Sequence, residues 1–246
     1  MRIQDKIERI DYSKCEDFFE ARGKKYSESN PYAVTMYQDE NPVLVNKRNR
    51  AETEKLIPML SLDEKSRILD VACGIGRWAD AIEKNVDSYV GLDFSESLIK
   101  LAKKRNRRNN FKFVVSEAVK IRETLVSLQE HDFNVVLMVG IFMYLNDEDV
   151  YSVADQTERS LEKKSRICIR EPVGIEHRLT LKDFYSEELK DNYNAIYRTR
   201  EEFKLFLESS FMDRGFRITN EGFLFDNKEL NNRRETSQYY YILERD

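Results

Sequence analysis

The stretch that decides the fold is residues 68–79, which read Ile68-Leu69-Asp70-Val71-Ala72-Cys73-Gly74-Ile75-Gly76-Arg77-Trp78-Ala79. An apolar run leads into a turn with two glycines, and a helix-like stretch follows. Gly74 and Gly76 permit a positive φ and let a ligand approach the backbone. The free N–H groups at the start of the next helix favour a polar ligand. The stretch therefore predicts a buried strand, a ligand-binding turn and a helix.

Four further apolar runs have the same character as the first. They are short, rich in Val and Ile, and nearly continuous, as expected of strands buried on both faces. All five runs lie at 66–72, 88–94, 111–117, 133–140 and 165–174. Helix-like stretches alternate with them at 76–85, 95–108, 119–129 and 147–163. The alternation predicts a doubly wound α/β fold around a parallel sheet.

The C-terminal part departs from this alternation. After a helix-like stretch at 199–214, two strand-like segments at 215–225 and 236–245 flank a polar loop. This pattern predicts an antiparallel hairpin that completes the sheet.

The first 60 residues contain no comparable strand. We expect them to form a helical N-terminal cap, with helices at 4–20 and 43–60, on a single domain that spans 61–246. Three polar residues are typical helix N-caps. They are Ser95, Asn146 and Thr199, the last with Glu202 in a capping-box pattern.

Composition excludes several classes of protein. The 246 residues carry a formal net charge of −4, so no basic surplus supports a nucleic-acid partner. No run approaches the length of a membrane span, and the charged N-terminal sequence lacks the apolar stretch of a secretory signal. Cys15, Cys73 and Cys168 form neither a CxxC motif nor a disulfide framework, and only two histidines accompany them. We expect a cytoplasmic protein without a bound metal.

Two carboxylates define the ligand of the glycine turn. As a bare pattern the turn fits G-x-G-x-x-A, a dinucleotide fingerprint, and Asp93 lies 19 residues after Gly74, where a carboxylate accepts hydrogen bonds from a ribose. The pattern leaves nicotinamide and sulfonium cofactors open. Asp70 distinguishes them, because a carboxylate at the strand end repels a pyrophosphate and attracts an ammonium group. S-adenosylmethionine has an ammonium group, a ribose and no phosphate.

These segments resemble the motifs of class I S-adenosylmethionine-dependent methyltransferases over about residues 60–174. The matching segments are Asp70-Val71-Ala72-Cys73-Gly74-Ile75-Gly76, Gly91-Leu92-Asp93-Phe94-Ser95, Ser116-Glu117-Ala118 and Asn134-Val135-Val136-Leu137-Met138-Val139-Gly140. The resemblance implies a Rossmann-like, seven-stranded, mostly parallel sheet with an antiparallel C-terminal hairpin. The sequence departs from the family at Asn134, where an acidic residue is usual.

The resemblance also implies which residues bind the cofactor. Asp70, Ala72, Gly74 and Gly76 would hold the methionine part, with Cys73 in a slot for a small residue, and Asp93 would bind the ribose hydroxyls. The residues expected around the adenine and the sulfonium are Phe94, Leu98, Glu117, Ala118, Met138 and Val139. From the N-terminal cap, we expect Tyr37 and Arg48 to close over the cofactor.

The acceptor is expected to bind beside the ends of the fourth and fifth strands. The segment 172–198 is dense in aromatic and hydrogen-bonding groups and predicts a lid. His177 is our candidate general base, since its pKa lies near working pH, with a plain surface histidine as the alternative. Glu171 and Tyr144 are further catalytic candidates, and an ion pair between Glu171 and Arg170 is the structural alternative. The expected substrate-binding residues are Arg170, Arg178, Tyr185 and Tyr193.

The sequence thus predicts an enzyme that transfers a methyl group to a small polar metabolite. O-methylation of a sugar or nucleotide-activated sugar is the first expectation. N-methylation of a small amine is the second, methylation of a protein N-terminus is the third, and a catalytically silent cofactor-binding partner subunit is the alternative from another class. Methyl transfer from a sulfonium requires mainly the positioning of the acceptor. The sequence does not predict an oligomeric state.

Overall fold

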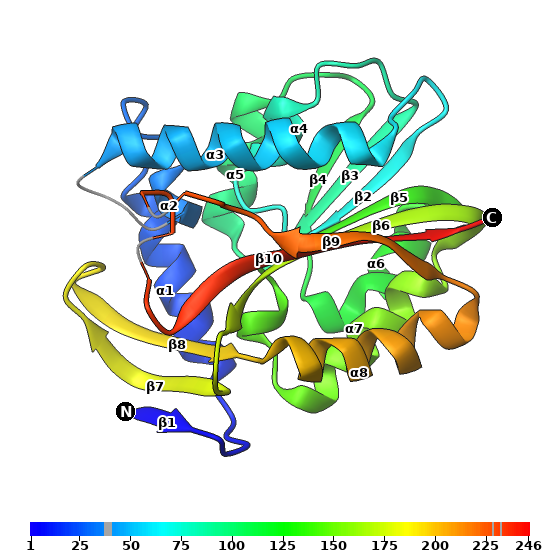
Figure 1. The fold of residues 1–246 in the computed structure, drawn as a ribbon. Helices are drawn as coiled ribbons and strands as arrows, with labels where there is room; N and C mark the ends of the chain where they lie inside the picture. Colours follow the sequence, from blue (N-terminus) through cyan, green and yellow to red (C-terminus); the bar gives the residue numbers. More distant parts are fainter. Residues whose placement is uncertain (37–40, 228, 232) are drawn as a thin grey trace.

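The central element is a seven-stranded sheet with the order β4-β3-β2-β5-β6-β10-β9 (Figure 1). The computed structural model describes residues 1–36, 41–227, 229–231 and 233–246. β4, β3, β2, β5 and β6 are parallel neighbours, and β10 runs antiparallel to both β6 and β9. The predicted α/β sheet and its antiparallel end are confirmed. The strands are β2 (Arg67–Val71), β3 (Ser88–Asp93), β4 (Phe111–Val115), β5 (Phe133–Val139), β6 (Leu161–Gly174), β9 (Arg217–Phe223) and β10 (Thr236–Arg245).

Helices cover both faces of this sheet (Figure 1). The first layer contains α3 (Pro42–Leu56), the 3-10 turn η1 (Ile57–Leu60), α4 (Arg77–Ala81) and α5 (Glu96–Arg105). The second layer contains η2 (Ala118–Lys120), α6 (Ile121–Ser127), α7 (Asp147–Glu158), α8 (Arg200–Ser210) and η4 (Met212–Arg214). Each layer buries its own apolar cluster, because alternate residues of a central strand face opposite sides, as Ile68 and Leu69 do. None of the helices described is both long and apolar enough to cross a lipid bilayer.

A second, three-stranded sheet adds a short strand to the predicted helical N-terminal cap, whose helices are confirmed. β1 (Arg2–Gln4) pairs antiparallel with β7 (Leu179–Ser186), which pairs with β8 (Asp191–Tyr197). The segment 172–198 is therefore mainly a β-hairpin, and the start of the chain forms its third strand. No local pattern indicates β1, because its partner lies about 180 residues away in the sequence.

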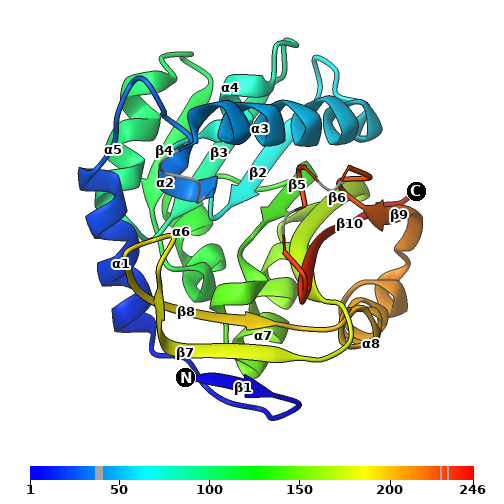
Figure 2. The same ribbon diagram turned by 60° about the vertical axis from the view of Figure 1, so that its left-hand side comes forward.

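The N-terminal helices lie across the carboxyl ends of the parallel strands (Figure 2). α1 (Tyr12–Lys24) and the short α2 (Ala33–Met36) precede α3. α1 is held on the start of α5, where Glu20 accepts hydrogen bonds from the Ser95 hydroxyl (2.6 Å) and the Ser97 N–H (3.1 Å). Gly23 allows this approach, since a Cβ there would lie 2.0 Å from the Ser97 Oγ. The helices thus cover the edge of the sheet where the glycine turn lies.

Helix ends match the predictions at two caps and differ at a third. Ser95 accepts from the Leu98 N–H, and Thr199 and Glu202 form the predicted capping box. Asn146 precedes α7, but its side chain caps nothing and bonds the backbone of Ile10 instead. α7 also ends earlier than predicted, because the chain turns after Glu158 and enters β6 at Leu161.

Candidate functional site

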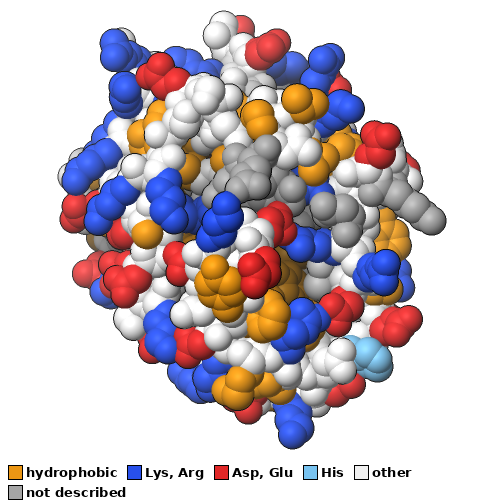
Figure 3. Space-filling model, turned by 90° about the vertical axis from the view of Figure 1, so that its left-hand side faces the viewer, with side chains coloured by type: hydrophobic (Ala, Val, Ile, Leu, Met, Phe, Trp, Pro, Cys, Tyr) orange, Lys and Arg blue, Asp and Glu red, His pale blue; other side chains and the backbone are white. Residues whose placement is uncertain are grey.

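A large cavity of about 670 Å³ lies at the carboxyl ends of the parallel strands. This volume suits a cofactor together with a small second substrate. Its floor comes from the ends of β2, β3, β4, β5 and β6 and the loops that follow them. Its walls come from α1, α2, α3, the β7–β8 hairpin and the segment before β10. On the face that carries α1 and the hairpin tip, acidic and basic side chains both surround apolar patches near the centre (Figure 3).

The glycine turn has the backbone that the sequence predicts, with one added feature. Gly74 has φ +55°, and a Cβ there would lie 2.9 Å from Thr35 Cγ2 of α2, which covers the turn. Gly76 has φ +73°, but its missing Cβ makes room for Phe113 and Asn106, and Gly76 does not line the cavity. Ala72 also adopts the left-handed region, with φ +64°. An alanine there is strained by about 1–2 kcal/mol.

Asp93 ties the turn to the end of β3. Its two carboxylate oxygens accept hydrogen bonds from the N–H groups of Gly74 (2.9 Å) and Ser95 (2.9 Å), and the side chain lines the cavity. Burial raises the pKa of Asp93 to about 6, although both backbone bonds favour the ionised form. Each oxygen retains a further lone pair with which it can accept a ligand hydroxyl.

Asp70 lies at the end of β2 and lines the same cavity. Its side chain is buried, and Tyr89 donates its hydroxyl hydrogen to Oδ2. Burial raises the pKa of Asp70 to about 7, with Tyr89 and the charge of Arg77 acting in the opposite direction. A cationic ligand group at this position would restore the ionised state.

Most of the other expected cofactor residues also line the cavity. They are Ala72, Cys73, Phe94, Leu98, Glu117, Ala118, Val139 and, from α3, Arg48. Met138 does not line it, because this side chain faces the core beneath the sheet. Tyr37 lies outside the described residues.

A cluster of phenols lines the cavity on the hairpin side. The hydroxyls of Tyr144, from the 3-10 turn η3 (Phe142–Tyr144), and Tyr193, from β8, lie 2.6 Å apart. Tyr193 is also a hydrogen-bond partner of Tyr197, and burial raises the pKa of Tyr197. The rings of Phe19 and Tyr144 pack in a T-shaped arrangement with their centroids 5.0 Å apart. The structure therefore brings the expected Tyr144 and Tyr193 together and adds Tyr197, which the sequence did not single out.

Arg170 forms part of a buried ion cluster on the cavity wall. Glu52 of α3 accepts a hydrogen bond from Arg77 (2.7 Å) and two from Arg170 (3.2 Å each), and Arg170 also donates to Gln238 of β10 (3.1 Å). The two guanidinium groups hold the pKa of Glu52 below its usual value despite burial. Arg77 and Glu52 carry no local signal of this role, because only the fold brings α3, α4 and β6 together.

Glu171 is a corrected prediction. Adjacent residues of a strand face opposite sides, so Glu171 lies away from Arg170 and away from the cavity. Its fully buried carboxylate accepts hydrogen bonds from the N–H groups of Ile141 (2.7 Å), Phe142 (3.0 Å) and Met143 (3.2 Å). Burial raises its pKa to about 7. Glu171 therefore positions the η3 turn that carries Tyr144.

His177, Arg178 and Tyr185 are likewise not brought to the cavity. The His177 ring is about half exposed in the turn between β6 and β7, and its Nδ1 lies 3.1 Å from Asp5 Oδ2. Tyr185 is exposed on the outer face of the hairpin. His177 is therefore a surface histidine, the alternative given above, and it is no longer the candidate general base.

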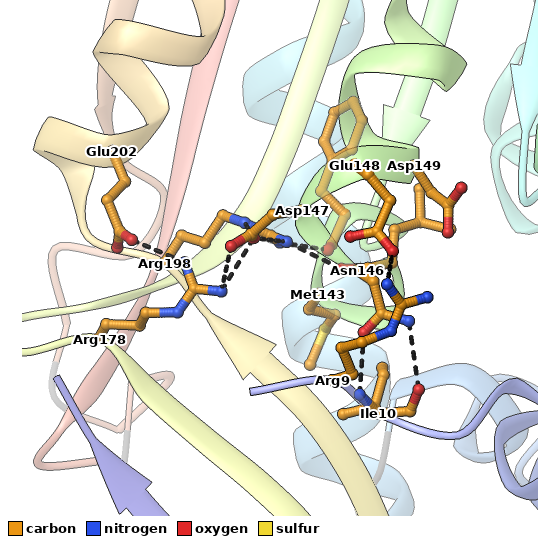
Figure 4. Close-up of polar contacts among 12 residues, drawn as sticks. Arg9, Ile10, Met143, Asn146, Asp147, Glu148, Asp149, Arg178, Arg198 and Glu202 are labelled. Carbon is orange, nitrogen blue, oxygen red and sulfur yellow. Dashed lines mark hydrogen bonds and ion pairs between the residues drawn. The ribbon is translucent and has the colours of Figure 1, made fainter. Parts of the chain in front are cut away.

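Arg178 instead belongs to a buried network that holds the base of the hairpin (Figure 4). Both Arg178, before β7, and Arg198, after β8, are directed at the carboxylate of Asp147, with distances of 2.9 Å. Arg178 also contacts Glu202 (2.7 Å), and Arg198 donates to the carbonyls of Phe142 (2.6 Å) and Leu145 (2.8 Å). Asp147 thus joins the two ends of the hairpin to the loop after β5.

The neighbouring Asn146 holds the N-terminal segment to the same loop (Figure 4). Its Oδ1 accepts from the Ile10 N–H (2.9 Å), and its own N–H donates to the hydroxyl of Tyr12 (2.8 Å). Tyr12 lines the cavity. One short loop therefore anchors both of the chain segments that form the wall on the hairpin side.

Comparison with known proteins identifies the central part of the chain. Residues 68–164 match the family model described as "Methyltransferase domain". Among curated relatives, "Phosphoethanolamine N-methyltransferase 1" of Triticum aestivum is 24% identical over 151 residues, which cover 60% of this chain and 30% of the relative. The protein of the same name from Caenorhabditis elegans is 23% identical over 154 residues, with 62% and 30% covered. The chain thus spans about a third of the length of these relatives.

Solved structures share the fold over nearly the whole chain. Haemonchus contortus phosphoethanolamine N-methyltransferase 1, in complex with phosphoethanolamine and S-adenosylhomocysteine, superposes with a TM-score of 0.68 at 18% identity, covering 93% of this chain and 48% of that one. The DhpI–SAH complex gives a TM-score of 0.62 at 12% identity, with 94% of both chains covered. With the glycine turn and Asp93 in place, residues 68–164 form a methyltransferase domain of the class I, S-adenosylmethionine-dependent type, and the solved structures share its fold over nearly the whole chain.

Proposed function

We propose that this protein N-methylates a small amine with S-adenosylmethionine as the methyl donor. This reading replaces O-methylation of a sugar as the first choice, since the phosphoethanolamine methyltransferases named above are N-methyltransferases. One observation about the cavity carries the proposal. Neither His131 nor His177 lines it, whereas the phenols of Tyr144, Tyr193 and Tyr197 do.

The acceptor chemistry follows from this set of side chains. A hydroxyl acceptor needs a base to remove its proton, whereas an amine needs only to be unprotonated. The three buried carboxylates of the cavity, Glu52, Asp70 and Asp93, already accept hydrogen bonds from arginines, Tyr89 and the backbone. Phenols are neutral at working pH and can accept a hydrogen bond from the amine and direct its lone pair.

Burial in the cavity favours the reactive, unprotonated form of the amine. When bound, the cofactor supplies a sulfonium methyl group, whose bond to sulfur breaks as the bond to the acceptor nitrogen forms. Partial burial disfavours an ammonium ion, so the bound amine loses its proton to solvent more readily than in water. Of the arginines that line the cavity, Arg77 and Arg170 are already paired with Glu52.

In this proposal the cofactor half of the site uses the residues expected from the family. Asp70 would pair with the ammonium group of the methionine part and Asp93 would bind the ribose hydroxyls, with Phe94 and Leu98 beside the adenine. The cavity is large enough for an acceptor beyond these groups.

Transfer of labelled methyl groups from S-adenosylmethionine tests the proposal. The purified protein is incubated separately with ethanolamine, with phosphoethanolamine and with a hexose, and the labelled product is measured for each. We expect labelled product with at least one amine and none with the hexose. Transfer to the hexose alone would return sugar O-methylation to first place. If S-adenosylhomocysteine binds but no acceptor in a metabolite extract is labelled, the silent-subunit reading replaces the proposal.

A further inference from the structure

Between β5 and α7, the short turn η3 and the residues beside it line the cavity and carry Tyr144. The N–H of Tyr144 donates to the carbonyl of Ile141 (2.9 Å), and the N–H of Leu145 donates to that of Phe142 (3.3 Å). The first N–H groups and the last carbonyls of any helix have no partner inside the helix, and in a turn this short they are most of its polar backbone groups. The side chains that bind these groups from outside therefore fix where the turn lies.

Glu171 on β6 binds the start of the turn. Its Oε1 accepts hydrogen bonds from the N–H groups of Ile141 (2.7 Å) and Phe142 (3.0 Å), and its Oε2 accepts one from the N–H of Met143 (3.2 Å). A carboxylate can accept all three, because each of its oxygens has two lone pairs. One fully buried side chain thus ties three consecutive residues to the central sheet.

Arg198, which follows β8, binds the other end of the turn. Its two terminal nitrogens donate to the carbonyls of Phe142 (2.6 Å) and Leu145 (2.8 Å). The side chain is buried, and its Nε–H donates to the carboxylate of Asp147 (Figure 4). Because β8 also carries Tyr193, Arg198 fixes the hairpin relative to the turn.

The two buried side chains together determine the geometry of a pair of phenols. The hydroxyls of Tyr144 and Tyr193 lie 2.6 Å apart, although the two residues belong to different segments of the chain. Glu171 holds η3 against β6, and Arg198 holds β8 against η3. A displacement of about 1 Å at either contact would move the two hydroxyls out of hydrogen-bond distance.

We propose that Glu171 and Arg198 are positioning residues for methyl transfer. They hold the hydroxyls of Tyr144 and Tyr193 where this pair binds the amine and directs its lone pair at the methyl group. The inference rests on the proposed N-methylation and adds two residues that lie outside the cavity lining. Their effect on the rate can be large, since a misplacement of about 1 Å can cost about 100-fold.

Steady-state kinetics of Glu171→Gln, with an amine that the unaltered protein methylates, tests the proposal. The amide oxygen can keep two of the three hydrogen bonds, but its NH₂ group then faces the N–H of Met143, next to Tyr144. We expect kcat to fall about tenfold or more. The KM for the amine and the affinity for S-adenosylhomocysteine should change little, because the cavity keeps all of its lining side chains.

Two further variants separate positioning from a general loss of stability. Glu158→Gln is the matched control, since it removes a carboxylate that pairs with Arg214 and Arg245 at the opposite end of α7, and it should leave kcat unchanged. Arg198→Lys keeps the charge beside Asp147 but loses the fork that reaches two carbonyls. It should lower kcat about fivefold, the loss of one hydrogen bond.

A spectroscopic measurement follows the turn without any turnover. In protein labelled with fluorotyrosine, the fluorine NMR signal of Tyr144 is identified by its loss in Tyr144→Phe. This signal should shift in Glu171→Gln and in Arg198→Lys and stay in place in Glu158→Gln. Circular dichroism checks that each variant is folded, and Arg198→Lys gives the same two measurements if Glu171→Gln does not fold.

The inference is overturned if Glu171→Gln keeps the kcat of the unaltered protein, if Glu158→Gln lowers kcat as much, or if the Tyr144 signal does not move. Failure of the proposed function has a different signature. In that case the unaltered protein methylates no amine, although the Tyr144 signal still shifts in Glu171→Gln and in Arg198→Lys.

Discussion

The two halves of the cavity are built in different ways. The cofactor half comes from one stretch of about 50 residues, in which each parallel strand positions its own polar residue: Asp70 near the end of β2, Asp93 at the end of β3 and Glu117 just after β4. The acceptor half is assembled from α1, α3, η3, β8 and the segment before β10. A side chain that one strand positions can be predicted from the local sequence. A site shared between distant segments cannot, because it depends on the contacts that hold those segments together.

The largest effect should come from breaking the network that supports the acceptor half. Asp147→Ala leaves the buried guanidinium groups of Arg178 and Arg198 without their shared carboxylate. We expect the free energy of unfolding to fall by about 3 kcal/mol, the lower end for a broken buried pair, because Asp147 itself is partly exposed. Chemical denaturation measures this change. Glu54→Ala, which breaks an exposed pair with Arg50 on α3, should cost about 0.5 kcal/mol at most. Equal losses in the two variants would contradict the assigned role of Asp147.

In the cofactor half, Asp93→Asn should have the next largest effect. The amide places an NH₂ group against one of the two backbone N–H groups and removes the charge that we expect to accept hydrogen bonds from the ribose hydroxyls. The affinity for S-adenosylhomocysteine should fall about 100-fold, or about 2.7 kcal/mol. Titration calorimetry measures it, with the exposed Asp213→Asn as the control. An unchanged affinity would remove Asp93 from the cofactor site.

Cofactor affinity should also depend on pH. Burial raises the pKa of Asp70 to about 7 and that of Asp93 to about 6, and the cofactor is expected to favour both ionised forms. Binding of S-adenosylhomocysteine should therefore strengthen about tenfold between about pH 5.5 and 7.5. Without ligand the trend has the opposite sign: these carboxyls bind protons more tightly in the folded state, so stability declines as pH rises from about 4, near their usual pKa, to about 7, and levels off above that pH. Asp70→Asn should weaken the pH dependence of both the affinity and the stability. If either dependence is the same in this variant, other groups cause it.

The difference between the two halves of the cavity also explains which features could be predicted from the sequence. The strands, the glycine turn, Asp70 and Asp93 were predictable, because buried parallel strands and tight turns leave local patterns. β1 was not, since three residues carry no periodicity and pair with β7 only in the folded chain. His177 and Arg178 were chosen for residue type alone, and the register of the hairpin directs them to Asp5 and Asp147 rather than to the cavity. The ion cluster of Glu52 left no trace in the sequence.

The phenol cluster offers a smaller test on the acceptor side. Tyr193→Phe removes the hydroxyl that joins Tyr144 and Tyr197, whereas Tyr185→Phe alters an exposed tyrosine of the same hairpin. We expect the first variant to lower kcat/KM for the amine about fivefold, the loss of about 1 kcal/mol, and the second to leave it unchanged. Steady-state kinetics with each variant gives the comparison, and the affinity for S-adenosylhomocysteine should stay constant in both. A loss confined to Tyr185→Phe would place the acceptor outside the cavity.

The smallest effect concerns the strain in the glycine turn. Ala72→Gly relieves a left-handed alanine but increases the entropy of the unfolded chain, so we expect a net gain of about 0.5 kcal/mol in stability. Ala51→Gly, inside α3, should instead lose about 1 kcal/mol. Thermal unfolding of the two variants should thus shift in opposite directions, and a destabilised Ala72→Gly would show that the alanine methyl group is needed for packing.

The most direct test of the account is a crystal structure of the protein with S-adenosylhomocysteine. The account predicts density along the carboxyl ends of β2 and β3, with the ribose hydroxyls within hydrogen-bond distance of the Asp93 carboxylate and the amino group beside Asp70. The sulfur should face Tyr144 and Tyr193. Density elsewhere in the molecule, or a ribose without a contact to Asp93, would contradict it.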